Sequence, residues 1–273
     1  MILVDGVELN YVKFPDGTTG LRREDKNNQF ITAEWIYQGD LAEVFVCLQL
    51  LRNNKVGAFV FTFLPFARQD GPVHIVNSSN NDHNEFSDLF AFLDIFKEFK
   101  ATQFMVRDCH SARVLPNGWI NIQTNWIDDL NKFDKEDTLI VFPDGSAWGR
   151  FGYKNFNDLE YISFCKDRDD KGNIIGMHTA HPYKLILESN DWKNILVFDD
   201  ICDGGATFIE LAKHLPKVNL HLFTTYGIYS KGLQVIYDAG YTSITCKFVI
   251  PWVEHVIENC PVDLKAPYEA PKE

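Results

Sequence analysis

Three acidic residues and a run of small residues follow a short apolar segment in the second half of the chain. Asp199 and Asp200 end the apolar run Ile195–Phe198, and Asp203 leads into Gly204-Gly205-Ala206-Thr207. Small residues let backbone N–H groups close around an anion, and the helical pattern that follows adds a favourable dipole. Carboxylates at a strand end can accept hydrogen bonds from sugar hydroxyls, and a metal ion would offset their repulsion. The segment therefore predicts a phosphorylated-sugar site on a strand, tight loop and helix, whereas an ordinary βα turn would need only the glycines.

A second polar segment follows the apolar run Val56–Phe63, which we predict to be a strand. It places Arg68, Gln69 and Asp70 side by side. Arginine can hold a phosphate group through two parallel hydrogen bonds, and glutamine can bind a purine edge or a hydroxyl. The segment is either a polar surface loop or part of a nucleotide site.

Other candidate ligand-binding residues lie at turns or after apolar runs: Phe14, Asp16, His110, Asp144, Lys166 and Arg168. Phe14 and Asp16 belong to a sequence that favours a β-turn. Lys166 and Arg168 alternate with aspartates in a polar segment without apolar periodicity, which predicts a loop. Taken singly, each of these has an ordinary structural explanation as a turn, a surface histidine or a solvated charge cluster.

The composition limits the classes of protein. The chain has 273 residues, 45% of them hydrophobic, which suffices for one large or two modest domains. A net charge of -12 disfavours a nucleic-acid-binding or anionic-membrane surface, where lysine and arginine would be in excess. The six cysteines form no Cys-x-x-Cys pair, and neither a signal peptide nor a membrane span is apparent. We therefore expect a reduced, soluble, cytoplasmic protein.

Short apolar runs alternate with amphipathic segments along the chain. Strands are predicted at Val56–Phe63, Phe104–Val106, Leu139–Phe142, Ile195–Phe198 and Leu220–Phe223, and a helix at Phe86–Lys100. This alternation predicts βαβ units and a parallel sheet. The polar stretch Asn117–Lys135 separates two halves, so we expect domains over residues 1–125 and 126–273.

The acidic strand-and-loop segment resembles the ribose-5-phosphate signature of the type I phosphoribosyltransferase fold, except that Gly204 replaces a threonine and Ala206 a glycine. Phe63-Leu-Pro-Phe-Ala-Arg-Gln-Asp-Gly71 resembles the Tyr-Phe-Pro-Tyr-Ala-Arg-Gln-Asp-Arg element of ribose-phosphate pyrophosphokinases, also called phosphoribosyl pyrophosphate synthetases. The resemblance implies an α/β fold of two tandem type I phosphoribosyltransferase-like domains, each with a mostly parallel sheet flanked by helices. The first domain would be the ATP side and the second the ribose-phosphate side.

Four shorter elements match the same family in chain order. Phe14-Pro-Asp-Gly17 resembles a loop that reaches the adenine of ATP from a neighbouring subunit, although Thr18 replaces its glutamate. Asp108-Cys-His-Ser111 resembles the element whose histidine, here His110, binds the metal of MgATP. Phe142-Pro-Asp-Gly145 resembles a loop whose aspartate, here Asp144, contacts metal and ribose. Lys166 and Arg168 match the Lys-x-Arg of a flexible loop that folds over the reacting phosphates.

The resemblance, to a short phage-type member of the family, implies a Mg²⁺-dependent transfer of the β,γ-diphosphoryl group of ATP to the 1-hydroxyl of ribose 5-phosphate, releasing AMP. Lys166 and Arg168 would stabilise the transition state, and His110 and Asp144 would hold Mg²⁺. The remaining residues would bind the two substrates. Those assigned to ATP are Phe14, Asp16, Arg68, Gln69, Asp70 and His110, and those assigned to the ribose phosphate are Asp199, Asp200, Asp203, Gly204, Gly205, Ala206 and Thr207.

The acceptor stays open at this point. Gly204 removes a hydroxyl from the phosphate loop and predicts more room for a larger 5′ substituent, so ADP-ribose is an alternative acceptor in a reaction that rebuilds NAD. A phosphoribosyltransferase, a non-catalytic regulatory relative and a sugar-phosphate-binding module are alternatives from other classes. We expect a homo-oligomer, a dimer or higher, without a nucleic-acid or membrane partner.

Overall fold

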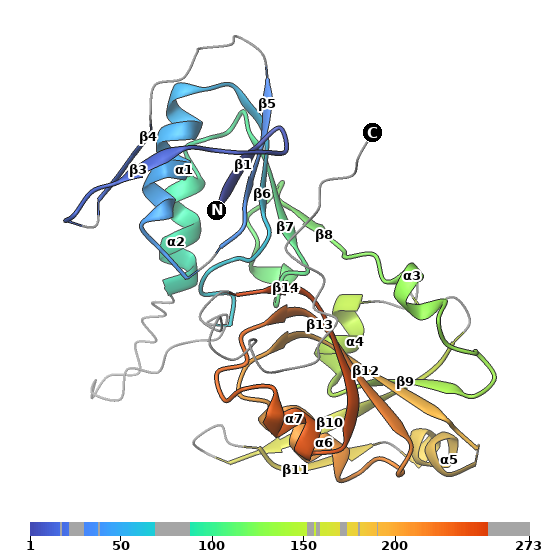
Figure 1. The fold of residues 1–273 in the computed structure, drawn as a ribbon. Helices are drawn as coiled ribbons and strands as arrows, with labels where there is room; N and C mark the ends of the chain where they lie inside the picture. The colour runs from blue at the N-terminus through green and yellow to red at the C-terminus, as the bar shows by residue number, and fades with distance from the viewer. Residues whose placement is uncertain are drawn as a thin grey trace, which may run out of the picture. The chain divides into compact units, whose positions relative to one another are not determined.

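Each half of the chain builds a six-stranded sheet in which most neighbouring strands run parallel. In the computed structural model these halves are two units, Met1–Gln123 and Thr124–Glu273 (Figure 1). The structure describes residues 1–16, 18–21, 30–37, 39–68, 88–151, 156, 159–169, 174–179, 181–189 and 191–250. Gln69 and Asp70 lie outside the described residues. None of the helices in the described ranges is long and apolar enough to cross a lipid bilayer.

The first unit has the sheet order β2-β1-β5-β6-β7-β8, and a separate hairpin pairs β3 with β4. Strands β5 to β8 run parallel, whereas β1 is antiparallel to both of its neighbours. The elements are β1 Ile2–Val4, β2 Val7–Glu8, β3 Tyr11–Lys13, β4 Thr19–Leu21, β5 Ile31–Trp35, α1 Glu43–Asn53, β6 Val56–Phe61, α2 Asp88–Phe96, β7 Gln103–Arg107, the 3-10 turn Ala112–Val114 and β8 Ile120–Ile122.

An aromatic core holds the first unit together. Phe59 and Phe61 of β6 pack against Phe96 of α2, with ring centroids 6.3 and 5.1 Å apart. Trp35 of β5 is buried in the same cluster and donates a hydrogen bond from Nε1 to Glu43 of α1. The helix and strand predicted from the apolar runs thus form, with slightly different bounds.

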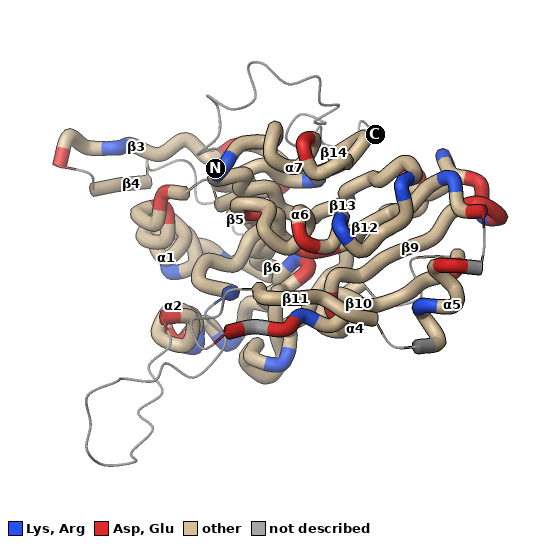
Figure 2. Tube along the Cα trace, turned by 90° about the horizontal axis from the view of Figure 1, so that it is seen from below, with Lys and Arg blue, Asp and Glu red and all other residues tan. Residues whose placement is uncertain are grey.

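The second unit has the sheet order β11-β10-β9-β12-β13-β14, with only β11 antiparallel to its neighbour. Strand β9, one of the two central strands, carries no charged residue, as its tan colour in Figure 2 shows. The elements are α3 Ile127–Leu130, β9 Thr138–Phe142, α4 Gly145–Phe151, β10 Glu160–Arg168, β11 Ile174–Thr179, α5 His181–Ser189, β12 Asn194–Cys202, α6 Ala206–Ala212, β13 Asn219–Gly227, α7 Gln234–Asp238 and β14 Tyr241–Val249.

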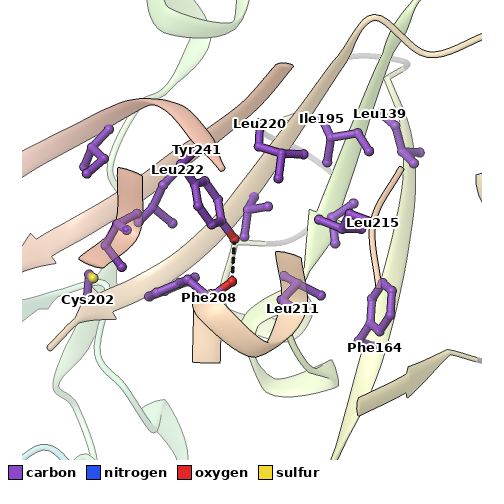
Figure 3. Close-up of a cluster of buried hydrophobic side chains, with 14 of the residues drawn as sticks. Leu139, Phe164, Ile195, Cys202, Phe208, Leu211, Leu215, Leu220, Leu222 and Tyr241 are labelled. Carbon is purple, nitrogen blue, oxygen red and sulfur yellow. Dashed lines mark hydrogen bonds between the residues drawn. The ribbon is translucent and has the colours of Figure 1, made fainter. Parts of the chain in front are cut away.

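Both faces of the second sheet are covered, which explains the continuous apolar runs of its strands. In β12, Ile195 and Val197 join the core beneath α6 and α7, whereas Leu196 and Phe198 join the core beneath α3 and α4. Figure 3 shows the first of these cores, where Tyr241 donates a hydrogen bond to the carbonyl of Phe208 at 3.1 Å. This packing fixes α6, and with it the loop that precedes the helix.

Two predicted boundaries differ from the structure. Strand β12 continues to Cys202 and not to Phe198, so Asp199 and Asp200 lie inside it, and Asp199 pairs in register with Thr224. The loop predicted at Lys166 and Arg168 is instead the end of β10. Pairing with β11 supplies the backbone hydrogen bonds there, and this pairing is invisible to a search for apolar periodicity.

Candidate functional site

Strand β12 carries a buried acidic pair that is held by an arginine from α4. Asp199 is 6% exposed and Asp200 is 2% exposed. The guanidinium of Arg150, whose side chain is only 8% exposed, lies 2.7 Å from Asp199 Oδ1 and 3.0 Å from Asp200 Oδ1. Arg150 therefore bridges two carboxylates in a region largely closed to water.

The charges in this cluster shift one another's pKa values. Burial, and then the neighbouring charge of Asp200, raise the pKa of Asp199 to about 7, against the opposing effects of Arg150 and Lys166. Burial alone would lower the pKa of Arg150, but the carboxylates of Asp200 and Asp199 raise it overall. A carboxyl that titrates near neutrality in a polar cluster is typical of a functional site.

Asp144 and Lys166 form an ion pair at the carboxyl ends of β9 and β10. Lys166 Nζ lies 2.7 Å from Asp144 Oδ2, and Asp144 Oδ1 accepts a hydrogen bond from the backbone N–H of Ala147 at 2.8 Å. Burial alone would raise the pKa of Asp144, but Lys166 lowers it overall, with a smaller contribution from Arg150. The two ion pairs thus belong to one electrostatic cluster.

The loop after β12 is tied to the loop after β13. Asp203 accepts a hydrogen bond from Ser230 Oγ at 2.6 Å. Gly205 has a φ of 78°, and a Cβ atom there would lie 2.5 Å from Cδ1 of Ile236, so only glycine fits. The backbone turns at this position into α6, which begins with Ala206 and Thr207.

The candidate residues of the first unit lie on the β3–β4 hairpin and after strands β6 and β7. Phe14 is exposed at the end of the β3–β4 hairpin, and exposed Asp16 accepts hydrogen bonds from the backbone and side chain of Thr18. Thr18 therefore fixes the turn through a short side chain, although the expected family residue was a glutamate. Half-buried His110 follows β7, and exposed Arg68 follows β6.

Several of the predicted residues of the second unit gather at the carboxyl ends of its strands. The second unit brings together Asp144, Lys166, Asp199 and Asp200, with Asp203 and the small-residue loop at the end of β12. Arg168 ends β10 two residues beyond Lys166. Within the described part of the chain, no three His, Cys, Asp or Glu side chains are arranged to hold a metal ion.

Sequence reasoning missed Arg150 and Ser230. The signal for Arg150 was its place in the helix that directly follows Asp144, since a helix there can carry a side chain back over the adjacent strand end. Ser230 gave no signal of its own, because the contact with Asp203 joins residues 27 positions apart.

The fold is similar to that of a solved phosphoribosylpyrophosphate synthetase. The crystal structure of the synthetase from Mycobacterium smegmatis matches with a TM-score of 0.63, covering 88% of this chain and 79% of that chain at 15% sequence identity. The predicted fold, two largely parallel sheets flanked by helices in the manner of type I phosphoribosyltransferases, is thus confirmed. No protein-family model matches the chain.

Two curated relatives carry the name of the same family. Ribose-phosphate pyrophosphokinase 4 of Arabidopsis thaliana is 23% identical over 136 residues, which are 49% of this chain and 37% of that protein. Ribose-phosphate pyrophosphokinase 3, chloroplastic, of Oryza sativa subsp. japonica is 26% identical over 99 residues, which are 35% of this chain and 22% of that protein. With the fold, these matches make the chain similar to the ribose-phosphate pyrophosphokinases, which are enzymes. The chain thus spans well under half the length of these relatives.

Proposed function

We propose that the chain transfers the β,γ-diphosphoryl group of ATP to the 1-hydroxyl of a ribose-5-phosphate moiety and releases AMP. The observation that carries the proposal is the charged cluster at the carboxyl ends of β9, β10 and β12, where Lys166 binds Asp144 and Arg150 binds Asp199 and Asp200. Ligands of parallel α/β sheets bind at this end of the strands. The cluster supplies carboxylates for a sugar and a cation for phosphates.

The proposed roles follow from the chemistry of the side chains. The 1-hydroxyl oxygen bonds to the β-phosphorus of ATP as the bond from that phosphorus to the α–β bridging oxygen breaks, and the hydroxyl proton is released. Lys166 and Arg168 stabilise the charge that develops on the bridging oxygen. Catalysis of this kind depends mainly on positioning the substrates and neutralising charge. Asp199 and Asp200 accept hydrogen bonds from the ribose hydroxyls, and Asp203 with Gly204-Gly205-Ala206-Thr207 surrounds the acceptor phosphate.

The residues present fit a magnesium ion in their chemistry. Carboxylate oxygens are the protein ligands that Mg²⁺ prefers, and Asp144 offers an oxygen that holds a cationic group, Lys166 Nζ, in the structure. Asp144 in the second unit and His110 in the first unit are each proposed as a Mg²⁺ ligand. When bound, Mg²⁺ would neutralise phosphate charge during transfer.

The first unit is proposed to bind ATP through Phe14, Asp16, Arg68, Gln69, Asp70 and His110. The exposed ring of Phe14 is available to stack on adenine. Because the resembling loop acts on a neighbouring subunit, we propose a cytoplasmic homo-oligomer, a dimer or higher, whose mass can be measured by light scattering.

Two acceptors remain within the proposal, ribose 5-phosphate and ADP-ribose, since both carry a free 1-hydroxyl and a 5-phosphate. The test is incubation with MgATP and either acceptor, followed by mass spectrometry of the nucleotide and sugar products. We expect AMP together with phosphoribosyl pyrophosphate or ADP-ribose pyrophosphate. Production of ADP would identify an ordinary kinase. In a separate incubation with phosphoribosyl pyrophosphate and a nucleobase, release of pyrophosphate would identify a phosphoribosyltransferase. Binding without turnover would identify a regulatory or binding protein.

A further inference from the structure

The loop after β13 is built against the loop after β12. The backbone N–H groups of Ile228 and Tyr229 both donate to the carbonyl of Cys202, at 2.8 and 3.2 Å. Ser230 Oγ adds the 2.6 Å hydrogen bond to Asp203. These hydrogen bonds join the two loops and hold Ser230, the residue that precedes Lys231, in a defined position.

The conformation of the β13 loop is unusual and specific. Tyr229 has a φ of 48°, which side-chain-bearing residues rarely adopt, and its buried ring covers Gly227. A Cβ atom at position 227 would lie 2.1 Å from that ring, so the loop requires glycine there. Backbone strain of this kind persists where the surroundings over-determine it, often beside a ligand site.

This loop lays the side chain of Lys231 across Gly204. A Cβ atom at position 204 would lie 3.3 Å from both Cδ and Cε of Lys231. Lys231 is exposed, and no ion pair links it to a carboxylate of the described residues. A lysine stem that packs on backbone while its ammonium stays in water presents a usable charge at the rim of the loop.

The space beside Gly204 is therefore occupied by the side chain of Lys231. The sequence alone indicated that the missing side chain leaves room for a larger acceptor, whereas the structure fills that room with the hydrocarbon stem of Lys231. Where the resembling signature has a threonine, Gly204 lacks the neutral hydroxyl and leaves space for the stem of Lys231, which carries an ammonium group. Hydrogen bonds between an ammonium and a phosphate oxygen are shorter and stronger than those from a hydroxyl.

We propose that Lys231 binds the phosphate group of the acceptor at the Asp203–Thr207 loop and takes the place of the hydroxyl that Gly204 lacks. The inference rests on the proposed function, because it concerns the acceptor site of that reaction. The shared ligand chemistry is a phosphate on the 5-position of a ribose, which ribose 5-phosphate and ADP-ribose both carry.

The test compares Lys231→Gln with Lys217→Gln, since Lys217 is also an exposed lysine without an ion pair to a described residue, and it lies before β13. Binding of ribose 5-phosphate, ADP-ribose and phosphate-free ribose is measured by titration calorimetry without ATP, and steady-state AMP release gives KM and kcat. We expect Lys231→Gln to weaken binding, and raise KM, of one or both phosphorylated acceptors about ten- to a hundred-fold. Ribose binding, KM for ATP and kcat should stay within about two-fold. Lys231→Arg should restore most of the affinity.

The outcomes separate the inference from the proposed function. Wild-type affinity of Lys231→Gln for both phosphorylated acceptors, or an equal loss in Lys217→Gln, would overturn the role of Lys231. Lys231-dependent binding without any AMP release would support Lys231 and overturn the proposed reaction. A wild-type protein that binds neither acceptor would overturn both. The phosphorylated acceptor that loses more affinity in Lys231→Gln is the one whose phosphate Lys231 binds.

Discussion

Lys166 Nζ lies 2.7 Å from Asp144 Oδ2, so the residue expected to stabilise the transition state is bound to the residue expected to hold a metal ion. The lysine side chain is 10% exposed and comes from a strand, not from a mobile polar loop. A cation arriving at Asp144 would compete with Lys166 for the same oxygen. If Asp144 holds Mg²⁺ as proposed, binding of the ion would therefore release Lys166 to contact phosphates.

Replacing Lys166 should impair both activity and stability. Lys166→Ala removes a contact to developing charge, which should lower kcat by about 10²–10³. It also leaves Asp144 without its charged partner, which should lower the free energy of unfolding by about 1.5–3 kcal/mol. Turnover assays and urea unfolding measure the two effects.

The matched control is Lys184→Ala on α5, because Lys184 pairs with Glu188 in an exposed i,i+4 arrangement. Such a surface pair contributes about 0–1 kcal/mol. Wild-type turnover in Lys166→Ala would make the β10 lysine a purely structural residue.

Arg150, which the sequence reasoning missed, should be a major determinant of the stability of the second unit. Arg150→Met leaves Asp199 and Asp200 buried without their shared cation, and breaking a buried pair costs about 3–5 kcal/mol. Chemical unfolding, followed by tryptophan fluorescence, measures this loss. Adding Asp199→Asn to Arg150→Met should recover part of it, because one uncompensated carboxylate is removed. An Arg150→Met variant as stable as the wild type would contradict this account.

The raised pKa of Asp199 determines the direction in which stability should change with pH. Its value of about 7 in the fold exceeds the ordinary value of about 4 expected in the unfolded chain. The folded state therefore binds this proton more tightly, and the free energy of unfolding falls as the pH rises from about 4 to about 7. Asp199→Asn removes this penalty.

The measurement is the difference in Tm between Asp199→Asn and the wild type, taken from about pH 5 to about pH 8. The difference should grow in favour of the variant as the pH rises. Asp137→Asn is a control, because Asp137 is an aspartate whose pKa is lowered by its ion pair with Lys193. A difference that stays constant with pH would show that Asp199 is ionised throughout.

Three of the six strands of the second sheet, β9, β12 and β13, were predictable because each contains a mainly apolar run. Ile195 to Phe198 face two cores alternately, which makes the run continuous and easy to recognise. Periodicity failed at Lys166, because the end of β10 is held by backbone pairing with β11 and not by an apolar face. It also failed at Arg150, since its importance comes from Asp199, a partner 49 residues away.

Gly204 and Gly205 should respond unequally to an added side chain. Gly205 has a φ of 78°, and its Cβ would lie 2.5 Å from Ile236 Cδ1, so Gly205→Ala combines backbone strain with a steric clash. We expect a loss of about 1–3 kcal/mol in the free energy of unfolding and impaired use of both acceptors. Gly204→Ala should be milder, because Gly204 is not among the positive-φ glycines and meets only a flexible lysine stem. Equal destabilisation by both substitutions would contradict the geometry.

Gly204→Thr tests how the loop chooses its acceptor. The backbone accepts threonine without the strain present at Gly205, but the stem of Lys231, 3.3 Å from the new Cβ, must move away. The variant gains a hydroxyl beside the acceptor phosphate and its added bulk narrows the loop, so a compact monoester should be favoured over a diphosphate diester. We expect the ratio of kcat/KM for ribose 5-phosphate to that for ADP-ribose to rise about ten- to a hundred-fold. Because the ratio cancels any general loss of activity, an unchanged value would remove Gly204 as the determinant of acceptor choice. In that case the selection would have to come from residues beyond the Asp203–Thr207 loop.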